Sequence, residues 1–339
     1  MQYRTLGRSG AVVSSYALGT MTFGSESSEE VSRQQLDTFL DHGGTLVDTA
    51  DVYSAGESEA IIGRWLRDLD PARRDSVFLA TKGRFPVGVE PRDAGISRRH
   101  LRRALDASLT RLGVDHVDLY QLHAFEQVTP LEESLGFLEY AVASGKIGYA
   151  GLSNFTGWQL TKAVALAGSR VPLVSNQPQY SLLVREIEWE VVPASLDAGL
   201  GLLPWSPLGG GWLTGKYRAD ERPTGATRLG EDPQRGVEAY DRRSGQERTW
   251  NVLAAVQDIA EARGMPLAQV ALAWLSGRPG VVAPILGART VEQLETNLGA
   301  ADVQLDESER SRLDEVSAPP AADYPYGEMG QQQRHRPLG

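Results

Sequence analysis

Four side chains that can do chemistry stand at or soon after the ends of short apolar runs with the length of buried strands. They are Asp48, Tyr53, Lys82 and His123. A tyrosine hydroxyl can protonate a developing alkoxide, but its ordinary pKa near 10 is high for work at neutral pH. A neighbouring ammonium such as that of Lys82 would lower this pKa. Asp48 would hold Lys82 by a buried ion pair, and His123 would orient a carbonyl oxygen. The set predicts carbonyl reduction and requires a separate hydride donor, because none of the four side chains supplies electrons.

A second set of polar and aromatic residues follows the later apolar runs. It comprises Ser153, Asn154, Gln177 and Trp205. The hydroxyl and the two amides are suited to bind a carboxamide such as that of nicotinamide, and an indole can stack on its ring. Each residue taken alone is commonly structural. Their joint occurrence at matching strand ends favours a nicotinamide cofactor as the hydride donor.

The elements that must position these residues alternate regularly along the chain. After a predicted hairpin at residues 2–14 come eight predicted strands, each followed by helix: Tyr16–Leu18, Leu46–Asp48, Val77–Thr81, Val117–Leu122, Ile147–Leu152, Leu173–Ser175, Leu200–Pro204 and Val281–Leu286. Eight such units predict an α/β fold, a closed (β/α)8 TIM barrel whose strand C-termini meet on one face. An open doubly wound sheet is the alternative, but the segment 19–24 lacks the G-x-G-x-x-G loop expected after its first strand.

Helices are predicted from apolar periodicity and from capping residues. They cover residues 29–42, 58–69, 97–112, 130–144, 156–167, 188–198, 249–263, 267–277, 291–299 and 307–316. The segment of about 209–247 is predicted to be an irregular lid loop. The tail, 319–339, is predicted to be irregular; it could cover the barrel mouth, mediate a subunit contact or be disordered. We interpret 1–339 as a single domain.

Composition excludes several classes of protein. The chain has 339 residues and no cysteine, so disulfides and thiolate metal sites are impossible. A net charge of −10 argues against nucleic acid as the main partner. No apolar run reaches the about 18 residues of a membrane span, the N-terminus lacks the pattern of a signal peptide, and the five histidines have no metal-ligand spacing. We expect a cytoplasmic monomer or homo-oligomer that acts on a small molecule without a metal.

In order and position, these motifs resemble the aldo-keto reductase superfamily over essentially the whole chain, with similarity both to bacterial members and to potassium-channel beta subunits. The family's catalytic Asp, Tyr, Lys and His match Asp48, Tyr53, Lys82 and His123. The resemblance implies an NADPH cofactor bound by Gly19, Thr20, Met21, Asp48, Ser153, Asn154, Gln177, Trp205, Ser206, Leu208, Gly210, Gly211, Thr214, Lys216, Arg228, Gly287, Arg289, Gln293 and Asn297.

Particular residues refine what the resemblance implies. Replacement of the histidine is associated in the family with reduction of carbon–carbon double bonds, so His123 favours carbonyl chemistry. A planar cation at Arg289 can grip a 2′-phosphate, which favours NADPH over NADH. Thr296 departs from the glutamate of many relatives, which bears on how strict that preference is. The candidate substrate pocket consists of Met21, Phe23, Tyr53, Phe85, His123, Phe125, Tyr180 and Trp212.

The leading hypothesis is NADPH-dependent reduction of an aldehyde or ketone, for example a sugar or secondary-metabolite carbonyl, with Tyr53 as the proton donor. One alternative is the reverse reaction, NADP-dependent oxidation of an alcohol. The other is a slowly turning-over, NADPH-binding regulatory subunit of a channel. The intact set of four residues does not distinguish these three.

Overall fold

A short antiparallel hairpin opens the chain and covers the N-terminal end of the barrel. The computed structural model describes residues 1–219, 221–225, 228–232, 234 and 236–334, without the side chain of Arg228. Strands β1 (Tyr3–Thr5) and β2 (Val12–Ser14) pair as the sequence predicts. Leu6 and Val13 are buried in an apolar cluster with residues of the barrel strands. The hairpin therefore covers the end of the barrel opposite the strand C-termini.

Eight parallel strands form the barrel wall, in the order β10-β3-β4-β5-β6-β7-β8-β9. They are β3 (Ala17–Gly19), β4 (Leu46–Asp48), β5 (Phe78–Gly83), β6 (Val117–Leu122), β7 (Ile147–Ser153), β8 (Leu173–Gln177), β9 (Gly201–Leu202) and β10 (Ile285–Leu286). The wall closes where the N–H of Val282 donates to the carbonyl of Leu202 at 2.9 Å and the N–H of Ile285 to Pro204 at 2.9 Å. This strand order confirms the predicted (β/α)8 barrel. The strands are apolar and buried on both faces, so the parallel sheet has to be covered by helices.

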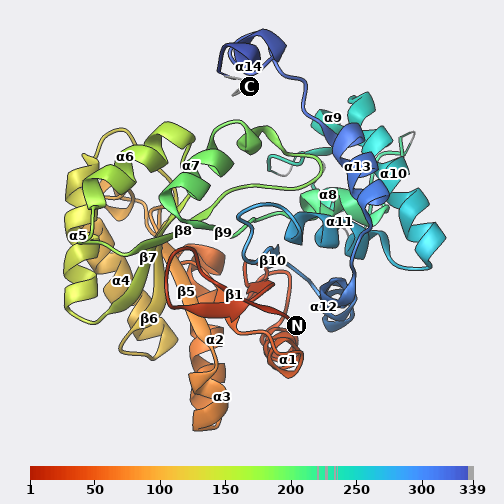
Figure 1. The fold of residues 1–339 in the computed structure, drawn as a ribbon. Helices are drawn as coiled ribbons and strands as arrows, with labels where there is room; N and C mark the ends of the chain where they lie inside the picture. The colour runs from red at the N-terminus through yellow and green to blue at the C-terminus, as the bar shows by residue number, and fades with distance from the viewer. Residues whose placement is uncertain (220, 226–227, 233, 235, 335–339) are drawn as a thin grey trace.

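Helices surround this wall (Figure 1). They are α1 (Glu29–Asp41), α2 (Glu57–Asp68), α3 (Pro71–Asp75), α4 (Arg98–Leu112), α5 (Leu131–Ala143), α6 (Gly157–Ala167), α7 (Val191–Ala198), α10 (Glu247–Arg263), α11 (Leu267–Ser276), α12 (Val291–Leu298) and the extra C-terminal α13 (Glu307–Ser317). Local sequence sets their ends. The Ser97 side chain accepts from the N–H of His100 at the start of α4, and Gly113 ends it in a left-handed conformation that favours glycine.

Three segments are more structured than the sequence predicts. Helix α3 was missed because it buries no residue and therefore has no apolar periodicity. The lid segment contains η4 (Gly209–Thr214), α8 (Arg228–Glu231) and α9 (Tyr240–Arg243). The tail contains α14 (Glu328–Arg334), which stands apart from the barrel in Figure 1. Tyr326 of the tail stacks on Trp189, just before α7, with 5.2 Å between the ring centroids.

A second apolar core lies beneath the lid segment. Its centre is Trp212, fully buried, which packs on the rings of Tyr217, Tyr240 and Trp250. The indole N–H of Trp212 donates to the carbonyl of Glu238 at 3.0 Å. The first part of the lid is therefore fastened by a packed core. No helix in the described residues has the length and apolar character needed to cross a membrane.

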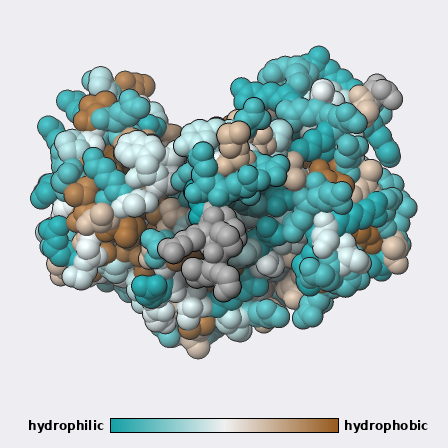
Figure 2. Space-filling model, turned by 45° about the horizontal axis from the view of Figure 1, so that its top comes forward, coloured by the Kyte–Doolittle hydropathy of each residue, from teal (hydrophilic) through white to brown (hydrophobic). Residues whose placement is uncertain are grey.

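The outer surface in the view of Figure 2 is largely hydrophilic. Hydrophobic residues gather mainly on the side of α5 and α6. Trp158 on α6 and Tyr140 on α5 are among the large side chains exposed to solvent.

Candidate active site

One large cavity, of about 980 Å³, lies at the C-terminal ends of the barrel strands. Its wall includes residues of β3, β4, β7, β8 and β10, the segment after β9, and the lid. This volume is at the upper end of ligand pockets. The fold therefore brings the sequence-predicted residues of distant segments to one place, as expected when parallel strands close into a barrel.

Lys82 connects two of the predicted catalytic residues. Its ammonium nitrogen lies 2.6 Å from Asp48 Oδ2, 2.8 Å from the carbonyl oxygen of Thr49 and 3.3 Å from the hydroxyl oxygen of Tyr53. An ammonium has three N–H donors, and all three are used. The tyrosine oxygen thus accepts from Lys82, which leaves the tyrosine's own proton available to another acceptor. Lys82 itself is fully buried, whereas Tyr53 and Asp48 line the cavity.

Two buried amides fix the Asp48 carboxylate from the other side. The side-chain amides of Gln121 and Gln177 each donate to Asp48 Oδ1 at 3.0 Å. Gln121 is not among the residues predicted above; its one signal in the sequence is that of a polar residue within an apolar strand, two positions before His123. Asp48 accepts bonds at both oxygens and is 2% exposed, so its geometry is tightly defined.

The loop that carries Tyr53 is conformationally strained. Ser54 and Ala55 both have positive φ, at 49° and 54°, which is rare for residues other than glycine. The Ser54 hydroxyl donates to the carbonyl of Phe23 at 2.7 Å and holds the turn against the β3–α1 loop. Two consecutive residues of this kind directly after Tyr53 indicate a side chain whose position is held by its surroundings.

His123 borders the same cavity between two aromatic rings. Its ring centroid lies 4.6 Å from Phe85 and 5.9 Å from Tyr53, both edge-on. Burial lowers the pKa of His123 to about 2, assisted by the positive charges of Lys82 and Arg84. The imidazole is therefore neutral at ordinary pH. Its Nδ1 is buried without a hydrogen-bond partner among the described residues.

The positive charge of Lys82 lowers the pKa of Tyr53, as the sequence predicts, but the net shift has the opposite direction. Burial raises the pKa of Tyr53, and the opposing charge of Lys82 does not cancel this effect. For Lys82, burial alone would lower the pKa, but Asp48 and Tyr53 together outweigh it, so its pKa is raised. The hydroxyl is therefore protonated and the amine charged at neutral pH.

A buried acid next to this group was missed. Asp51 is 2% exposed, and neither carboxylate oxygen has a hydrogen-bond partner among the described residues. Burial, together with the charge of Glu59, raises the pKa of Asp51 to about 7. Its backbone N–H donates to the carbonyl of Lys82 at 3.1 Å, which ties the Tyr53 loop to β5. Nothing in the sequence indicates that Asp51 is buried, because acidic residues are frequent in exposed loops.

The predicted carboxamide-binding residues form one network. The Ser153 hydroxyl donates to the carbonyl of Gln177 at 2.9 Å. The side-chain nitrogen of Asn154 donates to the carbonyl of His123 and to Ser153, each at 3.0 Å, and its side-chain oxygen accepts from the Trp205 indole at 3.0 Å. The network holds Trp205 at the cavity wall. Both amide hydrogens of Gln177 are used by Asp48 and Gln121.

A glycine-rich turn and a basic residue line the lid side of the cavity. Gly210 and Gly211 have φ of 65° and 97°, and the N–H of Gly210 donates to the Ser206 hydroxyl at 3.1 Å. A φ of 97° is a conformation that residues with a side chain rarely adopt, so glycine is favoured at Gly211. The other predicted residues of this side, Leu208 and Thr214, also line the cavity.

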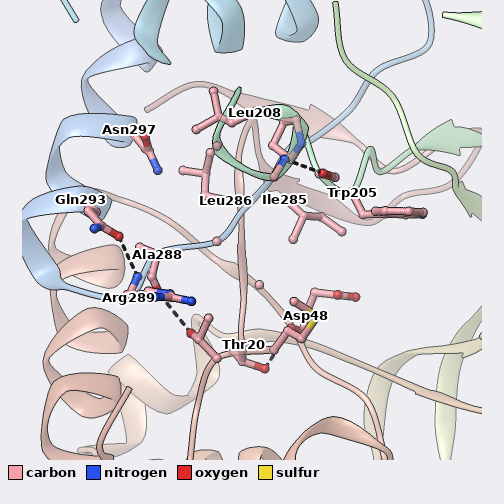
Figure 3. Close-up of a pocket in the computed structure, with 18 of the residues that line it drawn as sticks. Thr20, Asp48, Trp205, Leu208, Ile285, Leu286, Ala288, Arg289, Gln293 and Asn297 are labelled. Atoms are coloured by element: carbon pink, nitrogen blue, oxygen red, sulfur yellow. Dashed lines mark hydrogen bonds between the residues drawn. The ribbon is translucent and has the colours of Figure 1, made fainter. Parts of the chain in front are cut away.

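The far end of the cavity is formed by the β10–α12 segment (Figure 3). Gly287, Arg289, Gln293 and Asn297 border it there, opposite Asp48 and Trp205. The backbone N–H of Arg289 donates to Gln293 Oε1 at 2.9 Å. Gly19, Thr20 and Met21 line the cavity as well. The predicted cofactor-binding residue Arg228 has its side chain outside the described part of the structure.

The structure brings only some of the predicted substrate-pocket residues to the cavity. Met21, Tyr53, Phe85 and His123 line the cavity. Phe23, Tyr180 and Trp212 are buried in apolar cores, and Phe125 packs edge-on against Phe155 and Trp158. Aromatic residues near strand ends have the same sequence pattern whether they face a cavity or a core, which explains these errors. In the described residues, no group of three or more His, Asp or Glu side chains could hold a metal ion.

A parallel eight-stranded barrel with a wide cavity at its strand C-termini has the architecture of a barrel enzyme. Comparison with known proteins specifies the family: residues 16–318 match the model of the Aldo/keto reductase family. The chain therefore belongs to the aldo-keto reductases, and it is an oxidoreductase that acts on carbonyl groups.

Relatives with different printed functions match almost the whole chain. An uncharacterized oxidoreductase, YrpG of Bacillus subtilis, is 39% identical over 96% of this chain and 98% of its own length. A probable voltage-gated potassium channel subunit beta of Arabidopsis thaliana is 35% identical over 89% of this chain and 92% of its own. The versiconal hemiacetal acetate reductase of Aspergillus parasiticus is 32% identical over 95% and 98%, respectively.

Proposed function

We propose that this protein reduces an aldehyde or ketone to the alcohol with NADPH, with Tyr53 as the proton donor. The observation that carries the proposal is the Asp48–Lys82–Tyr53 chain of hydrogen bonds at a cavity wall that also contains His123. The family generally uses NAD(P)H, and the finer assignment to NADPH rests on Arg289 at the cavity's far end.

The cavity fits a long dinucleotide. Its two ends carry different groups: amides and an indole beside Asp48, and a guanidinium and amides on β10–α12 (Figure 3). Between them, the left-handed Gly210 and Gly211 place backbone at the wall. A Cβ at Gly287 would meet no atom within 4 Å, so the wall there is open. Gln177, Ser153, Asn154 and Trp205 would hold a nicotinamide, and Gly210, Lys216, Arg289 and Asn297 the phosphates and adenosine.

Each protein group then has a defined task. A bound NADPH supplies the hydride. The Tyr53 hydroxyl keeps its proton at neutral pH because burial raises its pKa, and it donates that proton to the substrate oxygen as negative charge develops there. Lys82 stabilises the resulting tyrosinate through its 3.3 Å contact, and Asp48 holds Lys82 in place. The neutral His123 can orient the carbonyl oxygen without competing for the proton.

The test is NADPH oxidation by the purified protein with a panel of aldehydes, ketones and keto-sugars. We expect turnover with at least one class. Tyr53→Phe should lower kcat by about 10²- to 10⁴-fold, the typical contribution of a positioned general acid, while NADPH still binds. The matched control is Tyr140→Phe, which removes an exposed hydroxyl on α5. Full turnover by Tyr53→Phe would refute the proton-donor role.

A second candidate is an NADPH-binding regulatory subunit, favoured by the similarity to the Arabidopsis relative whose printed name is that of a channel subunit. The same panel separates the two. Tight NADPH binding with negligible turnover on every carbonyl would favour regulation. Oxidation of alcohols with NADP⁺, measured in the same samples, tests the reverse direction.

A further inference from the structure

The predicted phosphate ligand, Arg289, is engaged by two carboxylates from different parts of the chain. Its Nε donates to Glu26 Oε2 at 2.7 Å. Its two terminal nitrogens donate to the two oxygens of Glu231 at 3.1 and 2.9 Å, in a bidentate pair. Glu26 lies on the β3–α1 loop and Glu231 ends α8 in the lid segment. Three segments distant in sequence therefore meet at one guanidinium.

This contact lies in the cavity and is only partly exposed to water. Glu26 and Arg289 both line the cavity, close to the predicted cofactor-binding residue Gln293. The exposed fractions of the side chains are 20% for Arg289, 17% for Glu26 and 47% for Glu231. Charges with this degree of burial are screened less than surface charges. Together, Arg289, Glu26 and Glu231 carry one positive and two negative formal charges.

The two carboxylates affect NADPH and NADH differently. A 2′-phosphate carries about −1.5 to −2 charges at neutral pH. To pair with Arg289 it must take donors from Glu231 or share them, and it must approach Glu26 as well. The 2′-hydroxyl of NADH is uncharged and can donate a hydrogen bond to a carboxylate, the arrangement typical of NAD sites. The two carboxylates therefore weaken the binding of NADPH but not that of NADH.

We propose that Glu26 and Glu231 are specificity-determining residues, which limit the preference for NADPH over NADH by competing with the 2′-phosphate for Arg289. The proposal rests on the proposed nicotinamide-dependent function. It adds that the lid residue Glu231 must give up its pair with Arg289, wholly or partly, when a phosphorylated cofactor binds.

The experiment compares dissociation constants for NADPH and NADH, measured by cofactor fluorescence, in wild type and in Glu231→Gln, Glu26→Gln and the double variant. Glutamine keeps the size of the side chain and removes the charge. We expect Glu231→Gln to tighten NADPH binding about three- to tenfold, and NADH binding to change less than about twofold. The double variant should show a larger change, and the gain should shrink as NaCl is raised from about 50 to 500 mM.

Glu295→Gln is the matched control, because Glu295 is an exposed residue of α12 that does not line the cavity. It should leave both constants unchanged. Thermal unfolding of each variant verifies that the fold is retained. An unchanged NADPH constant in both single variants would overturn the proposal, as would weaker NADPH binding, which would mean that the carboxylates position Arg289. A wild type that binds neither cofactor would instead refute the proposed function itself.

Discussion

The two ends of the cavity hold charges in opposite ways. At the Tyr53 end, the ion pair of Lys82 and Asp48 is fully enclosed, with exposed side-chain fractions of 0% and 3%. At the Arg289 end, the ion pairs to Glu26 and Glu231 remain partly in contact with water. The first pair comes from neighbouring strands β4 and β5, whereas the second joins two loops and the lid.

This difference indicates what each end can do. An enclosed pair whose remaining lone pairs are satisfied by Gln121 and Gln177 has a single geometry, which positioning of a proton donor requires. A partly exposed pair contributes little to stability and can exchange one partner for another. We interpret the Tyr53 end as preorganised and the Arg289 end as exchangeable, and the following predictions test this contrast.

The largest effect is expected for Lys82→Met. It leaves the Asp48 carboxylate buried and unpaired, so the free energy of unfolding should fall by about 3–5 kcal/mol. We expect kcat to fall by about 10²-fold or more. Urea unfolding and steady-state kinetics measure the two effects. Lys146→Met is the control, because Lys146 pairs with Asp106 at the surface and should cost below about 1 kcal/mol. Equal losses in the two variants would contradict the contrast.

A smaller effect is expected for Asp51→Asn and depends on pH. The pKa of Asp51 is about 7 in the folded state and 3.8 when unperturbed. A raised folded-state pKa means that the folded protein binds the proton more tightly. Asp51 therefore contributes stability that is fully present below about pH 4 and is lost as the pH rises to about 7, by roughly 1.4 kcal/mol per unit at most. Asparagine mimics the neutral acid and removes this slope.

Urea unfolding of wild type and Asp51→Asn between about pH 4.5 and 8 measures this prediction. The two proteins should be nearly equal in stability at the acid end, and the variant should be more stable by roughly 1–3 kcal/mol at the basic end. The same pH series for kcat shows whether ionisation of Asp51 also disturbs the Tyr53 loop. Parallel stability curves would show that Asp51 is ionised throughout.

The smallest effect is expected for Arg289→Ala. Its partly exposed pairs should add below about 1 kcal/mol to stability. Its affinity for NADPH should fall about tenfold, a loss of about 1.4 kcal/mol, whereas the affinity for NADH should change much less. Fluorescence titration with both cofactors measures the ratio. An equal loss of affinity for the two cofactors would show that Arg289 does not bind the 2′-phosphate.

Much of the fold and part of the site followed from local sequence. The bounds of Leu46–Asp48 were predicted as observed, because a short apolar run ended by an acid is a distinct signal. Trp212 was wrongly assigned to the substrate pocket, because its ring packs on Tyr217, Tyr240 and Trp250 in a core that depends on distant segments. Asp51 and Glu231 were not selected, since nothing local distinguishes them from ordinary surface acids.

The order of strands and the identity of the residues at their ends were determined by the sequence alone, because periodicity, caps and strand-end residues are local properties. They predicted the barrel and the side chains Asp48, Tyr53, Lys82 and His123. Only the tertiary structure decided how those side chains are charged and with which groups they pair. The effect of burial on the pKa of Tyr53 outweighs that of the Lys82 charge, so this pKa is raised. The tertiary fold also brings Glu26 and Glu231 into contact with Arg289. Both results depend on desolvation and on contacts between distant segments, which local sequence does not encode.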